Sequence, residues 1–244
     1  MYKHVNSASR IHALLTKAVE QPEKAIFRVW ADIFGIKGDD EAQTAQLVIV
    51  RLHWLHTELQ ILEKQVSAAK VSPHLYESAF VRINIILNPL HLPASWQGLR
   101  GNLSADVLLA LAFCNELLPD EESLIDPKDL DAIADEVAQL STLLVDSTLP
   151  DHLKQLIAHH IELIEEALAQ YQVFGAKALR AASRSALGEI IESKDIVGSA
   201  QQSDEVSRLG KLWANVNRVA DTALKAERVA QLGQRAWGAI STWL

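Results

Sequence analysis

The chain has 244 residues, of which 49% are hydrophobic and 22% are charged. This composition is too apolar for a disordered protein, and the length suits one large helical domain or two smaller ones. The single cysteine, Cys114, excludes an internal disulfide, and the longest apolar run is far shorter than the roughly 20 residues of a membrane-spanning helix. The N-terminus shows no signal-peptide pattern, so we expect a soluble, cytoplasmic protein.

The formal charge of −8 is distributed unevenly along the chain. Residues 116–166 contain 14 acidic residues against two lysines, a net charge of −12, whereas residues 205–244 carry a net charge of +3. Opposite charges in two parts of a chain can attract each other within one molecule or between two. The overall acidity argues against nucleic acid as a partner, because that would require clustered basic residues.

Apolar residues recur at spacings of three and four along the whole chain, which predicts an all-α fold. Three Pro-containing steps mark helix starts, the clearest being Asp126-Pro127. The predicted helices span residues 6–19, 22–35, 40–70, 73–87, 104–118, 127–146, 150–172, 174–192 and 205–244.

The two remaining segments divide this series of helices. Residues 88–103 contain two prolines and two glycines and are predicted to be mostly loop, and residues 193–204 form a polar linker. We therefore expect a multi-helix bundle of roughly eight helices over 1–192, followed by one long heptad-patterned helix over 205–244. The helix over 104–118 is apolar on nearly every side, which predicts a central position in the bundle.

The predicted C-terminal helix carries a seam sustained for about five heptads, a pattern typical of a coiled coil or a long bundle helix. Its middle consists of alanine and glycine, which would allow a partner helix to approach closely. The seam residues predicted to make the interaction are Leu209, Leu212, Val216, Val219, Ala226, Ala230, Gly233, Trp237 and Ile240.

These patterns favour a non-enzymatic helical interaction or regulatory protein that self-associates or docks on a protein partner through this helix. The basic bias and the tryptophans of residues 205–244 also suit an anionic membrane surface. That alternative is less favoured, because alanine and glycine at the centre of the seam contribute little to insertion. A bacterial defence or toxin–immunity setting is compatible with both interpretations.

An enzymatic alternative starts from Arg51-Leu-His-Trp-Leu-His56. An arginine followed by four residues and a histidine resembles the catalytic motif of the HEPN superfamily, all-helical domains that include many toxin and defence ribonucleases. The resemblance implies that His56 acts as general acid or base and that Arg51 stabilises phosphate charge. The sequence departs from the family pattern at Leu52, where a polar residue is usual. On a structural interpretation, both side chains merely flank the apolar seam of helix 40–70.

Other chemistry has weak support in the sequence. His53 and His56 share one helix face, but no further metal ligands can be identified, and no nucleotide-binding glycine loop occurs. Cys114 lies in the most apolar helix, where a thiol is inert. His160 falls on an apolar stripe, which predicts a core histidine with a hydrogen-bond partner. We therefore expect neither metal nor cofactor.

Overall fold

The computed structural model describes residues 5–38, 40–200 and 202–224. Within these ranges the chain is helical, and β-structure is limited to two isolated bridges, Ala25 with Ser95 and Glu122 with Leu224. The predicted all-α fold class is therefore confirmed.

The described residues separate into two compact units. One unit, here called the first unit, runs up to Glu121 and also includes Gln172–Phe174. The second unit comprises Glu122–Tyr171 and the chain from Gly175 onward. The predicted bundle over 1–192 has no boundary at Glu122, because the residues that join the two units carry no run of glycine or proline.

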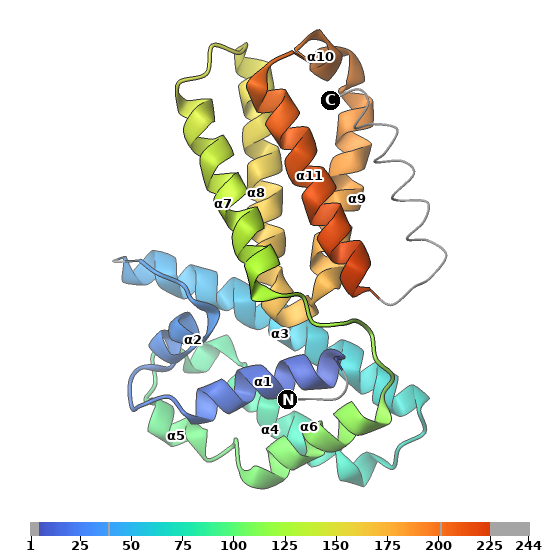
Figure 1. The fold of residues 1–244 in the computed structure, drawn as a ribbon. Helices are drawn as coiled ribbons and strands as arrows, with labels where there is room; N and C mark the ends of the chain where they lie inside the picture. Colours follow the sequence, from blue (N-terminus) through green and yellow to red (C-terminus); the bar gives the residue numbers. More distant parts are fainter. Residues whose placement is uncertain (1–4, 39, 201, 225–244) are drawn as a thin grey trace. The chain divides into compact units, whose positions relative to one another are not determined.

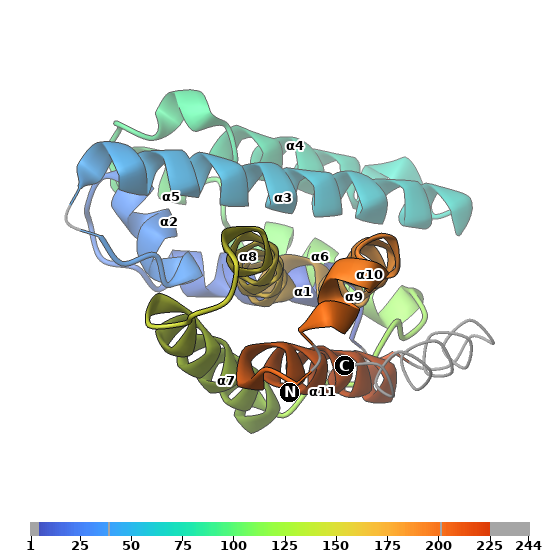
Figure 2. The same cartoon turned by 90° about the horizontal axis from the view of Figure 1, so that it is seen from above.

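In the described part of the first unit, six α-helices pack around one core (Figures 1 and 2). Helix α1 packs against α3 and α6, α2 packs against α3, and α4 packs against α6. The helices and their two 3₁₀ turns are α1 (Ser7–Val19), α2 (Ile26–Phe34), α3 (Glu41–Ala68), η1 (Pro73–Leu75), α4 (Glu77–Ile86), η2 (Pro89–His91), α5 (Trp96–Arg100) and α6 (Ala105–Leu117).

Residues 88–103 contain more structure than the predicted loop. The side chain of Asn88 accepts a hydrogen bond from the backbone of Leu90 and caps η2. Trp96, the first residue of α5, is fully buried and anchors the segment in the core. A helix of five residues with one buried side chain is too short to show an apolar repeat in the sequence. The glycines and prolines of this segment therefore led to the prediction of a loop.

A buried arginine connects several segments of the first unit. The guanidinium of Arg10 in α1 donates to Glu58 Oε1 in α3 at 2.5 Å and to Glu121 Oε2 at 2.7 Å. Its Nε donates to the carbonyl oxygen of Val173 at 3.0 Å. Separating α1 from α3 would leave Arg10 and Glu58 as unpaired buried charges, which is costly. These contacts therefore fix α1 against α3.

In the second unit, α7, α8, α9 and α11 run side by side as a helical bundle, and α10 lies at one end (Figure 1). Helix α11 packs against both α7 and α9. The helices are α7 (Pro127–Val145), α8 (Asp151–Phe174), α9 (Ala176–Glu192), α10 (Lys194–Ser199) and α11 (Asp204–Ala223). Asp126 caps α7 as its sequence predicted, whereas α10 occupies much of the expected linker.

Of the predicted helix over 205–244, the described residues form α11 and end one residue beyond it, at Leu224. Helix α11 ends at Ala223, and Leu224 is extended, with φ −71° and ψ 109°. The backbone N–H of Ser123 donates to the carbonyl oxygen of Ala223 at 2.7 Å, and Leu224 bridges to Glu122. The segment around Ser123, 100 residues away from Ala223 in the sequence, thus forms hydrogen bonds with the C-terminal end of the helix.

A polar network is buried between α9 and α11. Arg180 forms an ion pair with Asp221, and its Nη1 donates to Asn217 Oδ1 at 3.3 Å. Ser183 also donates to Asn217 Oδ1, and Asn217 Nδ2 donates to Asp221 Oδ2 at 3.2 Å. Such a network specifies one register between the two helices, because a shift would leave buried polar atoms without partners.

The turn between α8 and α9 requires glycine. Gly175 has φ +69° and ψ −155°, a conformation essentially restricted to glycine. A Cβ at this position would overlap the carboxylate of Glu122. That buried carboxylate accepts a hydrogen bond from the backbone N–H of Ala176 at 2.5 Å, at the N-terminus of α9 where negative charge is favourable.

We predict that Gly175→Ala lowers the free energy of unfolding by about 2–4 kcal/mol, because it combines backbone strain with a steric overlap. Gly188→Ala is the matched control, since Gly188 lies within α9 and a Cβ there would contact nothing within 4 Å. The control should raise stability by about 0.5–1 kcal/mol. Equal effects of the two substitutions in urea denaturation would contradict this account of the turn.

Candidate functional site

The predicted interaction seam falls into two parts. Leu209, Leu212, Val216 and Val219 lie in α11 and are almost completely buried in the core of the second unit. Their apolar surface is therefore used inside the chain. The remaining seam residues lie outside the described residues: Ala226, Ala230, Gly233, Trp237 and Ile240.

Arg51 and His56 lie on different sides of α3. Five residues on an α-helix correspond to a rotation of about 140°. The Arg51 guanidinium carbon lies 4.5 Å from the centroid of the Trp54 ring, a cation–π contact. The His56 ring is instead hydrogen-bonded to Gln60 at 2.9 Å. The two side chains expected to share a catalytic site thus have different neighbours.

His56 contributes to a groove in the first unit. The groove has a volume of about 450 Å³ and lies between α3 and the segment formed by the end of α4 and η2. Its lining is predominantly apolar. The residues that line it are Ile49, Leu52, His53, His56, Asn84, Leu87, Asn88 and Pro89.

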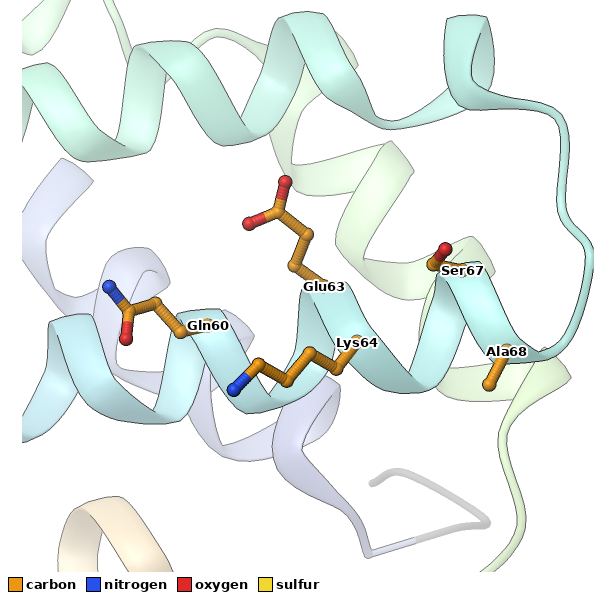
Figure 3. A pocket seen from close by; sticks show the side chains of 5 residues that line it. All are labelled: Gln60, Glu63, Lys64, Ser67 and Ala68. Carbon is orange, nitrogen blue, oxygen red and sulfur yellow. The ribbon is translucent and has the colours of Figure 1, made fainter.

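A second hollow, of about 680 Å³, follows the C-terminal half of α3 (Figure 3). The side chains that line it all come from this one helix: Gln60, Glu63, Lys64, Ser67 and Ala68. A wide hollow with one acid and one base on a single helix does not bring together the convergent groups that general acid–base chemistry requires.

His160 is a core histidine, as its apolar stripe predicted, but the predicted hydrogen-bond partner is not found among the described residues. The side chain is fully buried, and neither ring nitrogen has a partner within the described structure. The ring lies edge-on to Trp213, with 5.9 Å between centroids. Burial lowers the pKa of His160 to about 4, an effect that the charge of nearby Glu189 partly offsets.

Cys114 is a buried thiol, and the described acidic residues form no cluster suited to a metal ion. Burial raises the pKa of the Cys114 thiol to about 11, so the nucleophilic thiolate is disfavoured. Among the described residues, no three His, Cys, Asp or Glu side chains are grouped so that they could hold a metal ion. No helix in the described part of the chain is both long and apolar enough to cross a membrane.

Helix α6 exposes an apolar face to solvent, contrary to its predicted central position. Leu109 is 70% exposed, Phe113 42% and Leu117 44%, and they follow one another at intervals of four residues. The predicted central position of this helix is thus wrong, since only its opposite face is buried in the core. Asp106 and Glu116 lie on the same side as the exposed stripe, and these two charges could have identified the outward face.

Comparison with known proteins assigns the chain to no group. No family model matches it, and the searches of curated proteins and of solved structures found no match.

We predict that His160 makes the stability of the second unit fall as the pH is lowered. The unfolded histidine titrates near 6.5 and the folded one near 4, so between these values the unfolded state binds a proton that the folded state does not. The stability loss should begin below pH 6.5, level off below pH 4 and reach up to about 3 kcal/mol.

His160→Leu should remove this part of the pH dependence when urea unfolding is followed at several pH values. His53→Ala, which changes an exposed histidine of the first unit, is the control and should retain the wild-type slope. An unchanged slope in His160→Leu would show that other groups control the acid sensitivity.

Proposed function

We propose that this chain is a non-enzymatic helical interaction protein that associates with a second copy of itself. The observation that carries the proposal is the exposed stripe of α6, formed by Leu109, Phe113 and Leu117. Contiguous exposed apolar side chains on a folded protein are typical of surfaces that contact another protein. We name this surface the α6 stripe.

The α6 stripe is suited to such a contact because the opposite face of the helix is packed into the core. Val107, Leu111 and Cys114 on the opposite face are fully buried in the core of the first unit. A rigid helix face can be buried against a partner with little loss of conformational entropy. Aromatic residues such as Phe113 are enriched at the centre of protein interfaces.

Residues 225–244 offer a second contact for self-association. Their sequence continues the heptad spacing and contains Trp237 and Ile240. Their charged side chains are Lys225, Glu227, Arg228 and Arg235, and acids dominate residues 116–166. Attraction between these oppositely charged parts of two chains supports association.

The two alternatives from the sequence remain predictions. A ribonuclease site of this kind would need Arg51 beside His56, whereas the Arg51 guanidinium lies over the ring of Trp54. A membrane-surface effector would depend on residues 225–244, which lie outside the described structure.

We predict that Phe113→Glu weakens self-association at least tenfold, because the interface would have to bury an unpaired charge. The oligomeric mass measured by light scattering after gel filtration should fall toward that of the monomer. Stability should change by only about 0.5 kcal/mol, since Phe113 is on the surface.

Val145→Glu is the matched control, because Val145 is 80% exposed on α7 and lies far from α6 in the sequence. It should leave the oligomeric mass unchanged. A mass that is insensitive to Phe113→Glu, or equally sensitive to both changes, would refute a role for the α6 stripe.

A separate prediction concerns Trp237. Trp237→Glu in the full-length chain should weaken association if residues 225–244 contribute to the contact, because burial of a large aromatic side chain would be lost. Gln231→Glu, which adds the same charge in the same segment at a position off the seam, serves as control and should leave the mass almost unaltered. If Trp237→Glu retains the wild-type mass by analytical ultracentrifugation, the C-terminal contact is refuted while the α6 stripe is not.

A further inference from the structure

The groove between α3 and the α4–η2 segment has the size and composition of a small-molecule site. Its volume of about 450 Å³ lies within the range of about 300–1,000 Å³ that is typical of ligand pockets. Leu52 and Leu87, which are nearly fully buried, belong to the core and give the groove an apolar floor. Such a floor favours the apolar part of a ligand.

The polar groups that line the groove are two imidazoles and two carboxamides. They belong to His53, His56, Asn84 and Asn88, and the described lining includes no acidic side chain. Imidazole and carboxamide groups can both donate hydrogen bonds. Without a carboxylate in the lining, the groove can accept a negatively charged head group without like-charge repulsion.

Two contacts leave N–H groups of Asn88 and His56 available as donors. The Oδ1 atom of Asn88 accepts a hydrogen bond from the backbone N–H of Leu90 at 3.0 Å, and the Nδ2 hydrogens can donate to a ligand. The Nε2 atom of His56 lies 2.9 Å from Gln60 Nε2. Because an amide nitrogen only donates, this contact places the proton of the neutral His56 ring on Nδ1.

We propose that this groove binds a small carboxylate with an apolar tail, such as a medium-chain fatty acid. The apolar floor takes the tail, and the imidazole and carboxamide N–H groups donate to the carboxylate oxygens. Phosphate and other dianions suit the groove less well, since Arg51, the arginine of α3, lies over the ring of Trp54 and does not line the groove. The proposal is independent of self-association through α6.

The test is a titration of the isotopically labelled full-length chain with octanoate, followed by NMR, with octanol as the neutral compound of equal chain length. Octanoate should shift the amide signals of residues 49–56 and 84–90, and it should bind more tightly than octanol. The double variant His53→Ala/His56→Ala should bind octanoate roughly tenfold more weakly, because charge-assisted hydrogen bonds are lost.

His74→Ala is the matched control, because His74 belongs to the same unit but contacts Ser72 and does not line the groove. It should bind octanoate like the wild type. Equal affinity for octanol and octanoate would overturn the assignment of a carboxylate. Signal shifts outside the two stretches, an equal effect of His74→Ala, or no binding at all would overturn the site itself.

Discussion

The first unit depends on the pairing of the buried Arg10 guanidinium. Its contacts with Glu58, Glu121 and the carbonyl of Val173 join segments that are up to 163 residues apart in the sequence. A charge taken out of water is tolerated only when opposite charges and acceptors surround it, so the network favours one packing of α1 on α3. Since α6 packs on α1, the same constraint determines which face of α6 enters the core and which remains outside.

The two units treat their apolar surface differently. In the second unit α11 uses its seam internally, and the Arg180–Asp221 network fixes its register against α9. In the first unit, α6 carries more apolar surface than its core position can bury. This exposed apolar surface is the basis for proposing self-association, because its burial in a complex would be favourable.

Local patterns in the sequence predicted most helices, because their causes are local. Asp126-Pro127 starts α7, and the spacing of apolar residues defines α3 and α8. The end of α11 at Ala223 could not be predicted, since the carbonyl of Ala223 accepts a hydrogen bond from Ser123, far away in the sequence. The outward face of α6 and the groove beside His56 were missed for the same reason: both depend on which helices pack together. Only Asp106 and Glu116 indicated the solvent side of α6.

The central claim is that the chain associates through surface that its own core leaves exposed. Sedimentation equilibrium of the wild-type chain, from low to high micromolar concentration, tests it most directly. The account predicts a concentration-dependent mass that approaches twice the 27.0 kDa of one chain. A constant mass of 27.0 kDa over the whole concentration range would contradict it.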